Sequence, residues 1–293
     1  MTDGLTQHIP VLVQEVRTWL RPMAGQTLVD GTLGGGGHTR QLAIDVGVGG
    51  LIIACDRDSK AVEAAAVSLH ELPVQAVHAN YSDIPEVLSR LQVESVDGVL
   101  LDLGISSDQL ADRDRGFSFH STGPLDLRFD STRGEPAWKL LERLSAEHLA
   151  DLIFKYGEER FSRQIARRIV ENRRRAPIKT AQELAEVVRA TVPPSRFERI
   201  DPATRTFQAL RIGVNDELKW LEVALRRLPD CLKPGGRLAV ISFHSLEDRI
   251  VKTALRSDDR LEVLTRHPVR PSEQEIADNP RSRSAKLRVA ARK

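Results

Sequence analysis

Short apolar segments alternate with amphipathic segments between Thr27 and Leu101. This alternation is typical of βαβ units, which build a parallel sheet with helices packed against it. We expect strands at residues 27–30, 51–56, 74–79 and 96–103, and helices near residues 36–46, 59–70 and 83–91. Because such a sheet binds ligands at the carboxyl ends of its strands, polar residues at those ends are the first candidates for a functional site.

A different pattern occupies residues 109–212, where apolar residues recur at helical spacing and no strand is evident. Thr180 and Glu183 have the spacing of a capping box, and the helix that they begin should end at Pro193 and Pro194. Asp201, followed by Pro202, should begin another helix. Residues 111–136 are rich in Gly, Pro, Ser and charge, and we expect them to form a long loop.

The alternating pattern returns after Gly213 and includes a Pro-Gly-Gly turn at residues 234–236. We expect helices near residues 216–231 and 245–256, and strands at residues 237–243, 261–265 and 286–291. The sequence therefore predicts an α/β fold with a seven-stranded, Rossmann-like sheet built from residues 1–108 and 213–293. An all-helical domain, residues 109–212, is inserted into it, and we expect this domain to recognise the substrate.

Composition excludes several classes of protein. Hydrophobic residues make up 41% and charged residues 29% of the chain, as in ordinary globular proteins. The net charge of +2 does not mark a nucleic-acid binder by itself, so that role would need local basic clusters. The two cysteines lack the spacing of a metal site, and no stretch resembles a signal peptide or a membrane span. We expect a cytoplasmic protein with no bound metal and no membrane association.

The segment DGTLGGGGH, residues 30–38, follows a predicted strand and opens a predicted helix. Its glycines allow the backbone amides to approach a ligand closely. A P-loop would need a lysine, but Gly36 is followed by Gly37 and His38, and the dinucleotide pattern GxGxxG also fails. Asp30 with the glycines that follow fits DxxxGxG, a pattern that resembles the first motif of S-adenosyl-L-methionine methyltransferases, whose class I sheet also has seven strands in this order.

Asp56 ends the second predicted strand twenty residues after Gly36, where a carboxylate can accept both hydrogen bonds of a ribose diol. The glycine turn and Asp56 together predict a pocket for S-adenosyl-L-methionine. Two alternatives remain: a nicotinamide enzyme, or a tight turn without a ligand beside an acid on the surface.

The fourth predicted strand delivers DLGISSDQL, residues 102–110, to the same edge of the sheet. Methyltransferases that modify exocyclic amines usually carry a polar residue followed by Pro-Pro-aromatic here, and that motif is absent. Asp102, Ser106 and the backbone carbonyls around Gly104 are the candidate catalytic acceptors, which would hold the amine hydrogens and aim the nitrogen lone pair at the methyl group.

Aromatic residues are rare in this chain, yet the charged loop carries Phe117 and Phe119 directly after Arg115. We expect these three residues to contact RNA, with the rings stacked against an extruded base, although the rings could instead pin the loop onto the core. His244 follows the fifth predicted strand and is a further candidate to line the pocket; the alternative there is a helix cap made by Ser245.

Two stretches concentrate positive charge. Residues 160–179 hold eight Lys or Arg residues against one acid, and residues 281–293 hold six against none. Such clusters suit a phosphate backbone, and we expect Arg173, Arg174 and Arg175 to contact RNA. The alternative is a solvated helix face together with an edge strand on which Lys286 and Arg288 point outward.

The motifs together resemble one family, the small-subunit (16S) ribosomal RNA cytosine-N4 methyltransferases. The matching stretches span nearly the whole chain: HIPVL (8–12), DGTLGGGGHT (30–39), DRD (56–58), NYSD (80–83), DLGISSDQL (102–110), RGFSF (115–119), GPLDLRFD (123–130), YGEER (156–160), TRTFQALRIGVNDEL (204–218), PGGRLAVISFHSLEDRIVK (234–252) and RSRSAKLR (281–288).

This resemblance implies N4 methylation of a cytidine in the decoding region of 16S ribosomal RNA (rRNA), within the assembled small ribosomal subunit. It also implies that seven residues contact the cofactor: Gly36, Gly37, His38, Asp56, Tyr81, Asp102 and Gln109. Tyr81 stands where we expect phenylalanine, which keeps an aromatic wall beside the adenine. Asp102 would then serve the cofactor rather than the amine. The competing hypotheses are a methyltransferase that acts on protein or a small molecule, and a non-catalytic ribosome assembly factor.

Overall fold

The computed structural model describes residues 10–193 and 200–293, so His8 and Ile9 of the HIPVL motif and Pro194 lie outside the described residues. The chain divides into two compact units, which we call the sheet unit and the inserted unit. Met1–Ser106 and Leu218–Lys293 form the sheet unit, and Ser107–Glu217 form the inserted unit. The sequence placed these borders at 108/109 and 212/213.

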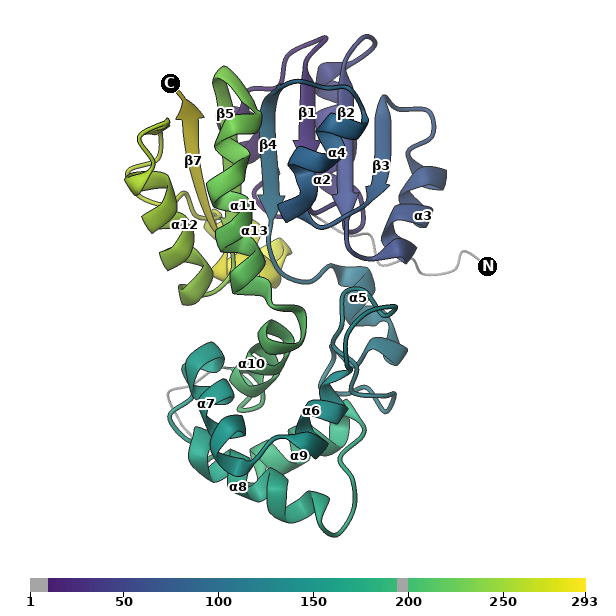
Figure 1. Ribbon diagram of the computed structural model, residues 1–293, viewed down its shortest axis with the longest axis vertical. Coiled ribbons are helices and arrows are strands. Elements are labelled where there is room, and N and C mark those ends of the chain that lie inside the picture. The colour runs from purple at the N-terminus through teal and green to yellow at the C-terminus, as the bar shows by residue number, and fades with distance from the viewer. Residues whose placement is uncertain (1–9, 194–199) are drawn as a thin grey trace. The chain divides into compact units, whose positions relative to one another are not determined.

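The sheet unit contains one sheet of seven strands in the order β3-β2-β1-β4-β5-β7-β6. The first five are parallel, and β7 runs antiparallel to both of its neighbours (Figure 1). This order confirms the predicted class I methyltransferase sheet. The strands are β1 (Thr27–Asp30), β2 (Leu51–Asp56), β3 (Val74–His78), β4 (Val96–Asp102), β5 (Leu232–Ser242), β6 (Leu261–Val263) and β7 (Lys286–Arg292).

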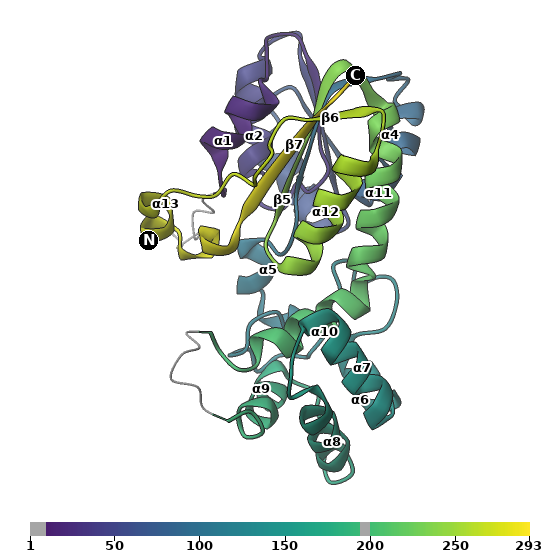
Figure 2. The same ribbon diagram turned by 90° about the vertical axis from the view of Figure 1, so that its left-hand side faces the viewer.

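Helices cover both faces of the sheet because neighbouring strand residues alternate between two cores. Leu28 and Leu100 pack with α1, α2 and α3, whereas Val29 and Leu101 pack with α4, α11 and α12. Figure 2 shows α1 and α2 on one side of the sheet and α4, α11 and α12 on the other. The helices of this unit are α1 (Val13–Leu20), α2 (Gly37–Val46), α3 (Ser59–Ser68), α4 (Ile84–Arg90), α11 (Glu217–Cys231, which begins at the border), α12 (Ser245–Ser257) and α13 (Glu273–Asp278), with 3-10 turns at Tyr81–Asp83 and Pro280–Ser284.

Three details differ from the sequence-based expectation. Helices α1 and α13 were not predicted. The Pro-Gly-Gly segment lies inside β5, where the register against β4 jumps from Val96↔Leu232 to Gly98↔Arg237. The strand β7 is internal rather than an edge, since β6 pairs with its far side.

Strand β7 also neutralises much of the C-terminal positive charge. Lys286 Nζ and Arg288 Nε lie 3.2 and 2.7 Å from the two carboxylate oxygens of Asp248, and the Arg288 side chain is only 8% exposed. These two cations therefore form ion pairs inside the sheet unit, and the alternative in which they point outward from an edge strand is wrong.

The described part of the inserted unit consists of helices, turns and loops, and its one β-type pairing is an isolated bridge between Pro124 and Thr180. Its capping box at Thr180 and Glu183 is present as predicted, and the helix predicted from Asp201 begins at Thr204. The helices are α5 (Ser107–Ala111), α6 (Ala137–Arg143), α7 (Ala146–Gly157), α8 (Ser162–Arg173), α9 (Ala181–Arg189) and α10 (Thr204–Asn215), with a 3-10 turn at Arg113–Arg115. No helix among residues 10–193 and 200–293 has the length and apolarity that crossing a membrane requires.

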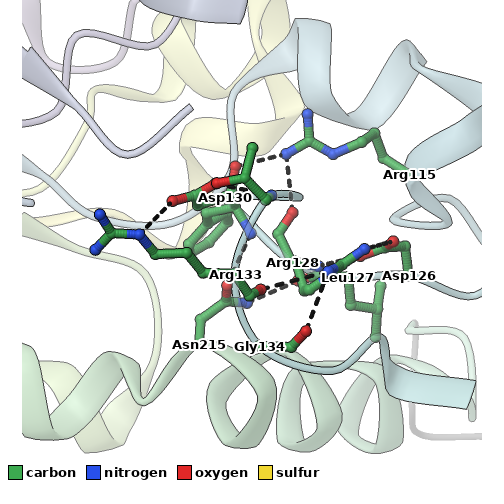
Figure 3. A network of polar contacts seen from close by, with 10 residues as sticks. Arg115, Asp126, Leu127, Arg128, Asp130, Arg133, Gly134 and Asn215 are labelled. Carbon is green, nitrogen blue, oxygen red and sulfur yellow. Dashed lines mark hydrogen bonds and ion pairs between the residues drawn. The ribbon is translucent and has the colours of Figure 1, made fainter. Parts of the chain in front are cut away.

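The predicted loop, residues 111–136, is fixed by two buried polar side chains (Figure 3). The Arg115 guanidinium donates to the carbonyl oxygens of Arg128 and Phe129, at 2.8 and 2.9 Å. Asn215, at the end of α10, donates to the carbonyl oxygen of Leu127 at 2.7 Å and accepts from the amide of Phe129 at 2.8 Å. We call these two side chains the loop clamp.

The clamp leaves no backbone polar group of residues 127–129 without a partner. The remaining amides are those of Leu127, which donates to the carbonyl oxygen of Arg115 at 2.9 Å, and Arg128, which donates to the Asp126 carboxylate at 3.1 Å. Leu127 has φ 62°, an uncommon left-handed conformation for a branched residue. The surrounding hydrogen bonds hold the segment in this conformation.

We expect Asn215→Ala to lower the free energy of unfolding of the inserted unit by about 2–4 kcal/mol, because it leaves a buried amide and a buried carbonyl unpaired. Denaturant unfolding measures this loss, and faster hydrogen exchange at the Phe129 amide should accompany it. Gln208→Ala is the matched control, since Gln208 lies on the same helix and donates one hydrogen bond, to the carbonyl oxygen of Tyr156. An Asn215→Ala loss no larger than that of the control would show that the clamp does not hold the loop.

Candidate functional site

Three aspartates end three adjacent strands of the sheet unit. Asp30 ends β1, which pairs with β2 on one side and β4 on the other, and these strands end at Asp56 and Asp102. Because the strands are parallel, the three carboxylates meet at one edge of the sheet. The arrangement concentrates negative charge where the polypeptide turns from strands into loops.

The glycine turn begins directly at this edge and continues the pairing of β1. The amide of Gly31 donates to the carbonyl oxygen of Leu100, and that of Leu33 donates to the carbonyl oxygen of Cys55, both at 2.9 Å. Gly36 has φ 76° and precedes α2. A side chain on Gly37 would place its Cβ 2.9 Å from Pro10. The glycine at position 37 therefore lets Pro10 pack closely against the turn, and the turn has no side chains of its own that would cover the N-terminus of α2.

Asp30 organises the turn from beneath. Its side chain is 1% exposed and accepts hydrogen bonds from the Thr39 hydroxyl at 2.7 Å and the Thr32 amide at 3.1 Å. The Thr32 hydroxyl in turn accepts from the backbone amide of Asp102 at 2.6 Å. Burial raises the pKa of Asp30, and the Thr39 hydroxyl offsets part of this effect. Asp30 thus links the turn to the end of β4.

Asp56 braces the same turn from β2. Its carboxylate accepts from the amides of Gly34 and Asp58, each at 2.8 Å. Burial raises the pKa of Asp56 to about 6, although these two amides favour the ionised form. The carboxylate is thus already oriented, and its remaining lone pairs can accept further hydrogen bonds.

His38 and Asp102 face each other across the edge, with His38 Nε2 3.5 Å from Asp102 Oδ2. Burial disfavours the imidazolium, but the carboxylates of Asp102 and Asp30 outweigh it, so the pKa of His38 is raised. Within the part of the chain that the structure describes, His38 Nε2 and Asp102 Oδ1 are buried without a hydrogen-bond partner. Buried polar atoms are rarely left in this state, which points to a polar ligand at this position.

Tyr81 and Ser106 also lie beside the glycine turn. Tyr81 follows β3, is half-buried, and its Cβ would lie 3.0 Å from a Cβ placed on Gly31. Ser106 Cβ would lie 3.3 Å from a Cβ placed on Gly34. The structure therefore brings together seven predicted site residues in the sheet unit: Gly36, Gly37, His38, Asp56, Tyr81, Asp102 and Ser106.

His244 is the N-cap of α12. Its Nδ1 accepts a hydrogen bond from the amide of Glu247 at 3.4 Å. The Glu247 carboxylate in turn accepts hydrogen bonds from the amides of Phe243 and His244. The capping interpretation was thus right about the position but wrong about Ser245, because His244 itself makes the cap. The cap uses only Nδ1, so the assignment of His244 to the pocket remains a prediction.

The other predicted site residues lie in the inserted unit. Gln109 is 8% exposed and lies on α5. Arg115 and Phe117 are each 5% exposed; Arg115 belongs to the loop clamp, and Phe117 stacks on Phe129 with centroids 5.8 Å apart. Phe119 packs edge-on against Phe207 at 4.9 Å. The prediction that Arg115 and Phe117 contact RNA is corrected here, because both are buried as packing and clamping residues.

The three consecutive arginines, residues 173–175, have different environments. Arg173 Nη1 donates to the carbonyl oxygens of Leu141 and Leu144, the latter at 2.7 Å, so it ties α8 to the end of α6. Arg174 and Arg175 are exposed. Within this run, Arg174 and Arg175 are therefore the side chains best placed for an RNA contact.

Thr32 and Thr39 were quoted in the sequence motif but were given no role. Their hydroxyl groups connect Asp30 to both the turn and β4. Thr39, the third residue of α2, carries a hydroxyl group that could be expected to bind an acid at a strand end. Only the structure shows that this acid is Asp30.

The chain matches the model of the MraW methylase family over residues 5–293. It is 49% identical to the ribosomal RNA small subunit methyltransferase H of Rhodopirellula baltica, over 98% of this chain and 92% of that protein. It is 50% identical to the protein of the same name from Sorangium cellulosum, over 98% of this chain and 91% of that protein. Identity to the one from Syntrophotalea carbinolica is 46% over the full length of both. With a match of this extent, the chain belongs to the MraW methylase family.

Proposed function

We propose that this protein transfers the methyl group of S-adenosyl-L-methionine to N4 of a cytidine in small-subunit rRNA. The observation that carries the proposal is the pair of buried, unpartnered atoms, His38 Nε2 and Asp102 Oδ1, beside a bare glycine turn in a chain of the methylase family. The printed names of the relatives support rRNA as the substrate class. Family membership also confirms the resemblance drawn from the motifs.

The residues at the strand ends fit S-adenosyl-L-methionine chemically. The cofactor carries a sulfonium and an ammonium group, and Asp30, Asp56 and Asp102 supply negative charge at this edge. In this proposal the backbone at Gly36 and Gly37 contacts the methionine part of the cofactor, with the Gly37 amide as the donor because the Gly36 amide already donates to the carbonyl oxygen of Leu33 at 2.7 Å. Asp56 accepts the ribose hydroxyls, and Tyr81 lies beside the adenine. His38 and Asp102 bind through their unpartnered atoms. When bound, the cofactor supplies an electrophilic methyl group.

The remaining task of the protein is to orient a weak nucleophile. The N4 amine of cytosine is conjugated with its ring, so its lone pair must be directed at the methyl group by acceptors that hold its hydrogens. The Ser106 hydroxyl and the backbone carbonyls around Gly104 are the acceptors that we assign, because this proposal gives Asp102 to the cofactor. A carboxylate or water then takes the extra proton.

The inserted unit would recognise the rRNA. We propose that the substrate lies in the decoding region of the assembled small subunit, in the cytoplasm, as the motif resemblance implied. The assignment of Gln109 to the cofactor, which the motif resemblance implied, remains a prediction. The fixed loop of the inserted unit supports the proposal, because recognition of a folded RNA benefits from a preorganised surface.

Transfer of radiolabel from S-adenosyl-L-methionine tests the activity. The protein is incubated separately with small subunits that lack the modification, with free small-subunit rRNA and with cell protein, and labelled nucleotides are mapped. We expect N4-methylcytidine at one position, with more label on subunits than on free rRNA. Label confined to protein, or no transfer to either RNA substrate, would overturn the proposal.

The raised pKa of Asp56 makes cofactor binding dependent on pH. A ribose diol needs the ionised carboxylate, which protonates below about pH 6. We expect the Kd for S-adenosyl-L-methionine, measured by calorimetry, to be constant above pH 7 and to rise up to about tenfold per pH unit well below pH 6. The stability of the unliganded protein should change with pH in the opposite direction. A raised carboxyl pKa contributes stability at low pH, and this contribution is lost as the pH rises through about 6.

Asp56→Ala isolates the contribution of this carboxylate. The variant should bind the cofactor about 1–3 kcal/mol more weakly at pH 7.5, because charge-assisted hydrogen bonds are lost. Its Kd should also lose the dependence on pH near 6. If the variant keeps the wild-type affinity, Asp56 does not belong to the cofactor site.

A further inference from the structure

Two lysines from different segments lie near the indole ring of Trp138, at the start of α6. Lys139 Nζ is 5.6 Å and Lys179 Nζ 5.7 Å from the ring centroid. Trp138 is half-buried, whereas both lysines are exposed. Neither ammonium group forms an ion pair within residues 10–193 and 200–293.

Backbone hydrogen bonds fix this arrangement. The amide of Trp138 donates to the carbonyl oxygen of Leu125 at 3.0 Å, and the amide of Leu125 donates to the carbonyl oxygen of Lys179 at 2.7 Å. The start of α6, the clamped loop and the residue before the capping box are therefore joined. The nearness of Lys179 to Trp138 follows from the fold rather than from a side-chain conformation.

More positive charge lies at the adjoining end of α8. Arg173 ties that end to the carbonyl oxygens of Leu141 and Leu144 on α6, and Arg174 and Arg175 come next in the chain. Both are exposed and form no ion pair among the described residues. Figure 1 shows α6, α8 and α9 close together within the inserted unit.

Two acids near this surface are already engaged. Glu183 accepts from the amides of Lys179 and Thr180, at 2.8 and 3.0 Å. Glu135 lies 3.5 Å from the Arg143 guanidinium. The two lysines beside the indole and the two arginines at the end of α8, at positions 139, 179, 174 and 175, form no ion pair among the described residues and remain available to an anionic partner.

We propose that Trp138, Lys139, Arg174, Arg175 and Lys179 bind a single-stranded segment of RNA. One base stacks on the indole, and the four cations contact the flanking phosphates; the lysines leave the ring to do so. An aromatic platform beside unpaired cations is the chemistry that recognises unstacked nucleotides, whereas a duplex would present only phosphates. The identification of this RNA as the rRNA substrate rests on the proposed function, but its binding does not.

Fluorescence anisotropy with a labelled single-stranded fragment of small-subunit rRNA, without methyl donor, tests the surface. Trp138→Ala should raise the Kd roughly five- to hundredfold, and Trp138→Phe should retain most of the affinity. The double variant Lys139→Ala/Lys179→Ala should reduce the slope of log Kd against log salt by roughly 1.4, because two phosphate contacts are lost. A duplex of the same sequence should bind both tryptophan variants as it binds the wild type.

Trp220→Ala is the matched control, because Trp220 also carries a lysine over its ring, Lys219 at 4.8 Å, but lies on α11. This control should bind RNA as the wild type does. In methyl transfer, Trp138→Ala should raise KM and leave kcat unchanged. Unchanged RNA affinity in both Trp138→Ala and the double lysine variant would overturn the inference, whereas wild-type protein that binds RNA without methylating it would overturn only the proposed function.

Discussion

Three carboxylates held at the ends of three adjacent parallel strands are the constraint on which the rest of the sheet unit depends. Since β1 lies between β2 and β4, Asp30, Asp56 and Asp102 necessarily lie close together at the strand ends. Burying acids so close together is unfavourable unless other groups compensate. The compensation comes from the amides of Gly34 and Asp58, the hydroxyl of Thr39 and the imidazole of His38. Together these groups fix the conformation of the glycine turn at the start of α2.

This compensation is incomplete. The polar groups that remain without partners are of the kind that the proposed cofactor can bind. His38 Nε2 and Asp102 Oδ1 lack hydrogen-bond partners in the described part of the chain, and burial raises the pKa of Asp56 to about 6. A cofactor that brings two cationic groups and a diol would relieve both conditions. The inserted unit is built differently, because its buried Arg115 and Asn215 have their bonds within the unit and serve to hold a loop.

Local signals in the sequence were sufficient for the sheet and for the glycine turn. The βαβ alternation gave the strands, and the capping box at Thr180 and Glu183 was recognisable because both partners are three residues apart. The short helix α1 has only eight residues, and its apolar side chains become informative only against the sheet. Side chains whose partners are distant in sequence could not be assigned: Arg115 and Phe117 read as exposed loop residues, yet they are buried, and Lys286 and Arg288 meet Asp248 only after the sheet closes.

The protonation state of His38 tests the balance of charge at the strand ends most directly. In the unliganded protein, NMR titration of the imidazole, assigned with His38→Gln, should give a pKa above the ordinary value of about 6.5. Asp102→Asn should lower that pKa, because burial then disfavours the imidazolium with one carboxylate fewer to oppose it. A wild-type pKa at or below about 6.5, or one that Asp102→Asn leaves unchanged, would contradict the account.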